Sequence, residues 1–175
     1  MTIEIAILQK FILFLGYPTR ALSVALFSLL LSSGVGSYVS GYLASKFKNV
    51  MKIIVLACLS IIILIAVYIF TLSMIFELLL QTSSSIRVVL AVLLIFPLGF
   101  FMGIPFPSCI SILKESTSES VPWIWGVNGL MSVLGSILAT IGGILFGFNF
   151  VLLFGIISYS IALVCIVFWK KHENG

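Results

Sequence analysis

Residues 53–68 read IIVLACLSIIILIAVY, a run with no charged side chain in which Ser60 and Tyr68 carry the hydroxyl groups. Because the run is apolar on every face, it suits a helix surrounded by lipid. A helix rises about 1.5 Å per residue, so about 20 such residues cross a hydrocarbon layer of about 30 Å. A membrane barrel would instead show segments of about 10 residues in which polar positions alternate with apolar ones. The run therefore predicts a membrane-spanning helix and excludes a barrel.

The rest of the chain has the same character. Charged residues make up 8% of its 175 residues and apolar types 62%, whereas a soluble protein carries about 25% charged residues. This composition excludes a soluble globular domain and intrinsic disorder. The last of four uncharged stretches is long enough for two crossings, with a turn at Gly147-Phe148-Asn149. The stretches are 21–45, 53–76, 88–113 and 120–169.

The charge gaps and turn signals together predict an all-α, polytopic membrane helix bundle of about six spans, with no soluble domain. The expected bounds are about 2–16, 20–44, 51–78, 86–113, 122–146 and 150–169. The first segment, at roughly 24 Å, is short for a full crossing. It is either a tilted or interfacial helix or the remainder of a helix that is longer in relatives, and we favour the second interpretation.

Basic residues indicate the orientation. Alternating spans place Arg20 and Arg87 on one side and six lysines on the other. The six are Lys46, Lys48, Lys52, Lys114, Lys170 and Lys171. The positive-inside tendency then predicts that both termini are cytoplasmic. Because these bases sit at helix ends and form no stripe with aromatic residues, the net charge of +4 does not indicate a nucleic-acid partner.

Polar residues inside spans are candidate functional residues, because they are unfavourable in lipid. Glu4, Gln9 and Lys10 interrupt the first segment. Glu4 and Lys10 lie about 120° apart around a helix, so they cannot form a good pair within it. Either both side chains reach water at the membrane faces, or Glu4 and Gln9 face a central cavity and bind a cation or proton, with Lys10 as the counter-charge.

Asn128 opens a second polar series, which Ser132, Ser136 and Thr140 continue at every fourth position. This face either contacts a neighbouring helix or lines a substrate path in which Asn128 is the leading member. Small residues at similar spacing predict close helix packing. They are Ser33, Ser37 and Gly41 in the second segment, Gly99 and Gly103 in the fourth, and Gly135, Ala139 and Gly143 in the fifth.

Three prolines, Pro97, Pro105 and Pro107, interrupt the fourth segment. Each removes a backbone donor, and we predict a kinked or broken helix near Gly103–Pro107. Transporters use such breaks at binding sites, and purely structural bundles contain them as well.

Residues for catalysis or metal binding are scarce. The cysteines lie far apart in apolar stretches and predict buried thiols, not a metal or redox site; they are Cys58, Cys109 and Cys165. No nucleophile–base pair or set of converging carboxylates is evident. The sequence predicts neither an enzyme nor a cofactor.

The loop between the second and third segments resembles the Gly-x-Leu-Ala-Asp-Arg-x-Gly-Arg loop of a major-facilitator half. Here it reads Gly41-Tyr42-Leu43-Ala44-Ser45-Lys46-Phe47-Lys48. Ser45, Lys46 and Lys48 stand where the pattern has Asp, Arg and its second Gly. The Asp that helps to lock the helices of transporters is therefore missing.

Longer stretches resemble the membrane region of bacterial proteins in which facilitator-like helices are fused to a spermidine-synthase-like domain. They read EIAILQKF, GYP and ALSV within 4–24, PLGFFMGIPFP at 97–107, and PWIWGVNG and SVLGS within 122–136. The resemblance implies a carboxy-terminal piece or a shortened relative of such a protein, in a bacterial inner membrane. The nucleotide-binding aminopropyltransferase domain has no counterpart in this sequence.

Two functions follow as expectations. A facilitator-like half-domain would move or present a small polar or cationic solute, and it would need an amino-terminal helical half or a second copy to complete the site. Alternatively, the helices form a membrane anchor or scaffold, without transport, for a fused or partner transferase domain of the polyamine type. The lipid bilayer is a partner in both cases.

Overall fold

The computed structural model of the protein describes residues 1–46, 49–116 and 121–173, and every regular element in these ranges is an α-helix. In chain order the helices are α1 (Thr2–Leu15), α2 (Pro18–Lys46), α3 (Val50–Leu79), α4 (Ser84–Met102), α5 (Pro105–Ser116), α6 (Val121–Phe146) and α7 (Phe148–Glu173). The predicted all-α class is confirmed. Phe47 and Lys48 of the facilitator-like loop lie outside the described residues.

Five helical stretches are long and apolar enough to cross a membrane: α2, α3, α6, α7, and α4 with α5 counted together over Ser84–Leu113. The chain thus has the helices of a multi-pass integral membrane protein. The expected first span forms α1, which has 14 residues and a length of about 21 Å. It is not among the five, because it is too short.

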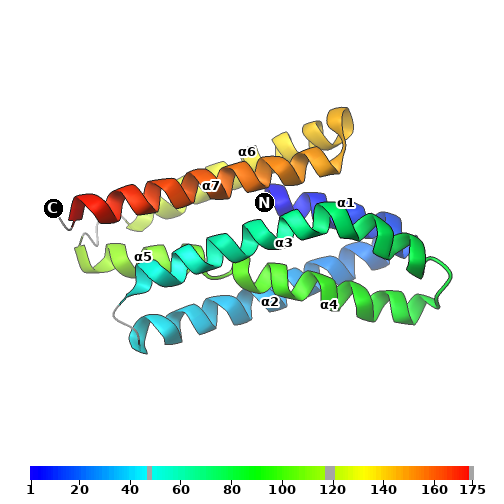
Figure 1. The fold of residues 1–175 in the computed structure, drawn as a ribbon, viewed down its shortest axis with the longest axis horizontal. Helices are drawn as coiled ribbons and strands as arrows, with labels where there is room; N and C mark the ends of the chain where they lie inside the picture. The colour runs from blue at the N-terminus through cyan, green and yellow to red at the C-terminus, as the bar shows by residue number, and fades with distance from the viewer. Residues whose placement is uncertain (47–48, 117–120, 174–175) are drawn as a thin grey trace.

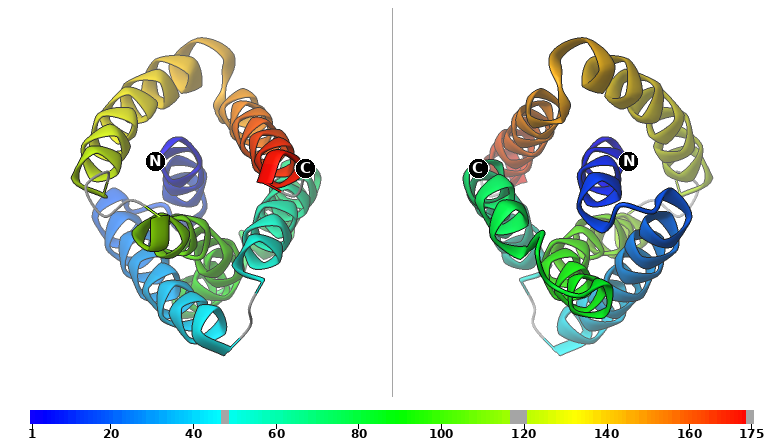
Figure 2. Two further views of the ribbon diagram at one scale, coloured as in Figure 1. Left: turned by 90° about the vertical axis from the view of Figure 1, so that its left-hand side faces the viewer. Right: turned by 90° about the vertical axis from the view of Figure 1, so that its right-hand side faces the viewer.

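The short helix α1 lies inside the bundle. Figure 1 shows the longer helices running along a common axis, with α1 starting about half-way along it. Seen along that axis, the other helices surround α1 (Figure 2). Helix α1 packs against α2, α4, α6 and α7. Among the described residues, α6 packs on α1 and α7 but hardly on α2. The ring of helices around α1 is therefore open between α6 and α2.

Phenylalanine rings fix α1 in the centre. Phe11 and Phe14 are buried. Phe76 of α3 stacks on Phe14 with 4.3 Å between ring centroids and meets Phe11 edge-on at 5.1 Å. Helix α1 then ends at Gly16, whose φ of 75° is a left-handed conformation that favours glycine. The chain can therefore turn sharply and enter α2.

Glycines allow α2 and α4 to approach closely. A Cβ atom on Gly36 would lie 2.0 Å from the Phe100 carbonyl oxygen, and one on Gly103 would lie 2.1 Å from the Ser33 carbonyl oxygen. The hypothetical Cβ of Gly99 would lie equally close to the Ser32 hydroxyl. Gly99 and Gly103 are thus packing positions, at the contact with α2.

The packing face of α2 differs from the expected stripe of Ser33, Ser37 and Gly41. Gly41 is exposed, and nothing lies within 4 Å of the position that its Cβ would take. The buried small residues are instead Ser28, Ser32, Gly36 and Ser40. The buried stripe has the expected four-residue spacing but is displaced by one residue. Two faces of α2 carry small residues, and α4 packs against the face of Ser28, Ser32, Gly36 and Ser40.

The predicted site of the helix break is where α4 gives way to α5. Helix α4 ends at Met102 and α5 begins at Pro105, while Pro97 lies inside α4 and Pro107 in the first turn of α5. The missing N–H of Pro97 removes the helical donor for the Leu93 carbonyl. Next to it, the Tyr68 hydroxyl of α3 donates to the Leu94 carbonyl oxygen. This bond ties α3 to α4 where α4 is weakened.

Replacing Gly36 by alanine should destabilise the bundle, because the new methyl group would overlap the backbone of α4. Overpacking typically lowers stability by about 1–3 kcal/mol. Gly41→Ala on the same helix is the matched control, since its methyl group meets open space. Thermal unfolding of the purified protein in detergent measures both variants. Equal midpoints would contradict the close approach of α2 and α4.

Removing the Tyr68 hydroxyl should also lower stability, by about 1 kcal/mol, because one interhelical hydrogen bond is lost. The variant is Tyr68→Phe. Tyr38→Phe is its control, since the Tyr38 side chain is 80% exposed and donates no hydrogen bond to a described residue. The same unfolding assay applies, and the hydrogen bond would be unimportant if both variants melted like the parent protein.

Candidate functional site

A polar crevice opens where the start of α1 meets α6 and α7. It has a volume of about 470 Å³ and is lined from three helices. The lining residues are Met1 and Thr2 of α1, Asn128, Met131 and Ser132 of α6, and Ser158, Tyr159 and Ala162 of α7. Since α1 starts about half-way along the bundle (Figure 1), this mid-bundle crevice lies far from both ends of the spans.

Thr2 and Gly135 hold α1 against α6 beside the crevice. The Thr2 hydroxyl donates to the Gly135 carbonyl oxygen at 3.4 Å. A Cβ on Gly135 would lie 3.0 Å from that hydroxyl oxygen, so glycine allows the contact. Ala139 is buried one turn further on, and Gly143 packs against the ring of Phe148. This predicted stripe of small residues therefore lies in helix contacts.

The polar series of α6 divides into two parts. Ser136 donates to the Ser132 carbonyl oxygen at 2.8 Å and Thr140 to the Ser136 carbonyl oxygen at 2.9 Å. Both hydroxyl groups are satisfied within their own helix. Asn128 and Ser132 line the crevice instead, and the Asn128 amide has no hydrogen-bond partner among the described residues. An amide with free donors and acceptors beside a cavity can bind a polar ligand.

Glu4 supplies the negative charge nearest to the crevice. Its carboxylate pairs with the amino group of Met1 at 3.5 Å and is 35% exposed. It also lies within electrostatic range of the Tyr159 hydroxyl. Of the predicted residues, Asn128 therefore lies in the lining of the crevice, and Glu4 is paired with Met1, which also lines it.

Gln9 and Lys10 do not belong to this site. They lie about 7–9 Å further along α1 than Glu4, and neither lines the crevice. Both side chains are half-buried, and Lys10 forms no ion pair with a described residue. Of the four predicted residues Glu4, Gln9, Lys10 and Asn128, the structure places Asn128 in the lining and Glu4 beside Met1 of the lining. The distance along α1 separates Gln9 and Lys10 from the crevice.

Sequence reasoning missed three polar residues of the site: Thr2, Ser158 and Tyr159. The Ser158 hydroxyl donates to the Phe154 carbonyl oxygen at 2.9 Å, while its oxygen still faces the crevice as an acceptor. The signal in the sequence is the polar Ser158-Tyr159-Ser160 interruption of an otherwise apolar stretch. It becomes informative only when α7 is known to face α1.

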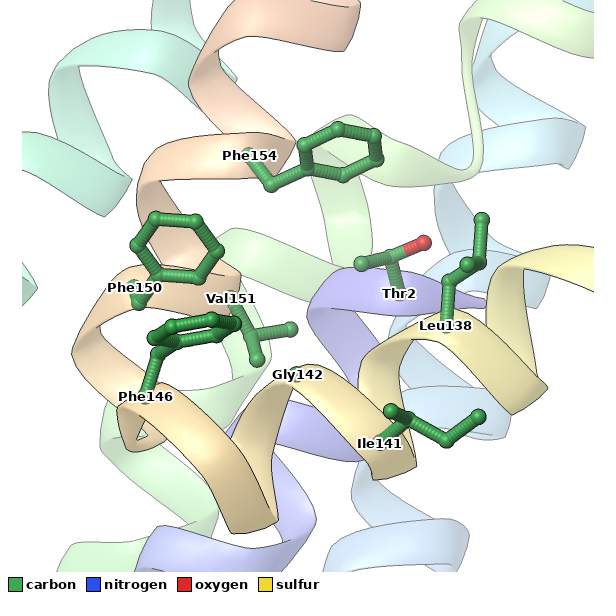
Figure 3. A pocket seen from close by; sticks show the side chains of 8 residues that line it. All are labelled: Thr2, Leu138, Ile141, Gly142, Phe146, Phe150, Val151 and Phe154. Carbon is green, nitrogen blue, oxygen red and sulfur yellow. The ribbon is translucent and has the colours of Figure 1, made fainter.

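A second pocket on the other side of Thr2 is apolar. Figure 3 shows that the rings of Phe146, Phe150 and Phe154 line it together with Thr2, which is the one hydroxyl-bearing residue of its lining. Its volume is about 220 Å³. This pocket offers contacts for hydrocarbon and almost none for a polar solute, so the mid-bundle crevice is the better candidate site.

Within the described residues, no three His, Cys, Asp or Glu side chains come together to hold a metal ion. Comparisons with family models, with curated proteins and with solved structures found no match.

Water should reach the mid-bundle crevice but not the apolar pocket. In a chain whose three cysteines are replaced by alanine, Asn128→Cys or Ser132→Cys should react several-fold faster with a charged thiol reagent than Ile141→Cys, because the reactive thiolate needs water. Ile141 lines the apolar pocket and is 50% exposed, which makes it a fair control. Equal labelling rates at the three positions would mean that the crevice is dry.

Proposed function

We propose that this multi-pass membrane protein binds a small polar or cationic solute in the mid-bundle crevice and moves it across the membrane as a facilitator-like half-domain. The observation that carries the proposal is the mid-bundle crevice itself. It gathers an unpartnered amide, four hydroxyl-bearing residues and a nearby carboxylate in a bundle that is otherwise apolar. Polar groups at such depth are unfavourable unless a partner or ligand satisfies them.

The chemistry of the crevice favours a cation or a neutral hydrogen-bonding solute. Glu4 contributes a carboxylate, and Asn128 and Tyr159 offer acceptors for an ammonium or hydroxyl group. Arg20 and Arg87 lie in the first turns of α2 and α4, at one end of the bundle, and they do not line the crevice. Met1 lines the crevice and its amino group is paired with the Glu4 carboxylate, so a cation would have to displace it from Glu4, whereas a neutral hydrogen-bonding solute would not.

The exposed first half of α6 suits a half-domain that needs a complementary helical half. Residues 125–131 of α6 are all exposed, and seven consecutive residues cover every face of a helix. A second copy of the chain, or a separate amino-terminal helical half, could close this side and complete the path, as in transporters with repeated halves. We further propose a bacterial inner membrane with the carboxy terminus and the lysine-rich end of the bundle in the cytoplasm. The expectation of a cytoplasmic amino terminus does not fit the bundle, because α1 starts about half-way along it.

A relation to spermidine-synthase-like membrane proteins makes polyamines the first solutes to test. In that case a fused or partner domain would supply any transferase chemistry. The alternative role, an anchor or scaffold for such a domain without transport, predicts no solute binding by the helices themselves.

Spermidine and single amino acids should be screened against the purified protein by thermal shift, and a hit should be titrated by calorimetry. Glu4→Gln and Asn128→Ala should each weaken binding by about ten-fold, which corresponds to about 1.4 kcal/mol. The reason is the loss of a charge or of the amide that faces the ligand.

Glu77→Gln is the matched control for Glu4→Gln, because Glu77 is exposed near the end of α3, away from the crevice. It should bind the solute like the parent protein. A bound solute whose affinity responds equally to Glu4→Gln and Glu77→Gln would place its site elsewhere. If no polyamine or amino acid binds and none is taken up by proteoliposomes, the anchor role is the better explanation.

A further inference from the structure

The first two turns of α3 form a ridge between two apolar crevices. Lys52 and Leu56 line both crevices, and their four-residue spacing places them on one face of the helix. The crevice on one side lies between α3, the end of α2 and the α4–α5 break, with a volume of about 470 Å³. The crevice on the other side lies between α3 and α7 and measures about 390 Å³.

Both crevices are apolar along their length and basic at one end. Leu43, Ala57 and Phe101 are among the residues that line the first, and Val55 and Ile166 are among those that line the second. Lys52 lies in the first turn of α3, at the end of the bundle where α2 and α7 also finish (Figure 1). Each crevice therefore runs from an ammonium group into hydrocarbon-like surroundings.

The charge at this ridge is unbalanced. Lys52 is exposed and forms no ion pair with a described residue. Lys46, at the end of α2, is exposed as well, with its ammonium 5.7 Å from the centre of the Tyr42 ring. The sequence contains no acidic residue between Glu4 and Glu77. The ridge thus presents positive charge at the depth where lipid headgroups lie.

From this arrangement we infer that the ridge of Lys52 and Leu56 is a specific binding site for a two-chain anionic phospholipid. The phosphate group pairs with Lys52, assisted by Lys46, and one acyl chain enters each crevice on either side of Leu56. A phospholipid fits better than a soluble anion because the two crevices offer apolar surface that an anion alone would leave empty. The site is separate from the mid-bundle crevice and does not depend on the proposed transport.

Native mass spectrometry of the full chain, delipidated in detergent, tests this inference. Dioleoyl phosphatidylglycerol should bind more tightly than dioleoyl phosphatidylcholine and more tightly than the single-chain lyso-phosphatidylglycerol. Lys52→Gln should weaken phosphatidylglycerol binding about five-fold, as expected for the loss of one cation near the headgroups. Arg20→Gln, at the opposite end of the bundle, should leave it unchanged.

Three results would overturn the inference: equal binding of the two diacyl lipids, equal binding of the diacyl and lyso forms, or equal effects of Lys52→Gln and Arg20→Gln. The comparison of diacyl with lyso lipid uses the unmodified protein, so it stands even if a substitution disturbs folding. Thermal melting of each variant without added lipid provides the folding control.

Discussion

The structure depends on one constraint: the hydrocarbon layer has no water to satisfy polar groups, so the chain must satisfy them itself. Helices do this for the backbone, and the side-chain hydroxyls follow the same rule. Ser28, Ser32 and Ser40 are buried on α2, and each donates to a carbonyl oxygen of its own helix at 2.6–2.7 Å. Because these bonds are internal to α2, its small polar face can pack against α4 without interhelical partners. Close contact then depends on glycine.

Two polar side chains without a described partner depart from this rule, and they do so in different surroundings. Ser108 of α5 is fully buried, and its hydroxyl is the one buried side-chain group without a partner among the described residues. It follows the α4–α5 break by one turn, where helix geometry is already interrupted. Asn128 is the opposite case, since it is exposed and faces an open crevice. A hydroxyl enclosed in the core is closed to a solute, whereas a free amide beside a cavity can bind one.

The sequence predicts where the helices lie well, but it predicts poorly which face of each helix packs against its neighbours. One physical reason explains both outcomes. Long uncharged stretches limit where a chain can cross lipid, so α2, α3, α6 and α7 begin and end within a few residues of the expected bounds. Rotation about each helix axis is less constrained, because lipid and neighbouring helices are both apolar. The sequence alone therefore does not distinguish the face of Ser33, Ser37 and Gly41 from the face of Ser32, Gly36 and Ser40 as the packing face. Gln9 and Lys10 are excluded from the crevice for a different reason, since they lie about 7–9 Å further along α1 than Glu4.

The first half of α6 is the surface against which the proposed complementary half would pack. Exposure of apolar residues to lipid is ordinary in a membrane protein, so the exposed leucines and valines of α6 indicate nothing by themselves. Gly126 and Gly129 have open space around them, and Asn128 between them has no described partner. Small residues beside a polar amide are the features that membrane helices use to associate. The proposed second helical half would pack against the glycines, while the Asn128 amide remains turned toward the crevice.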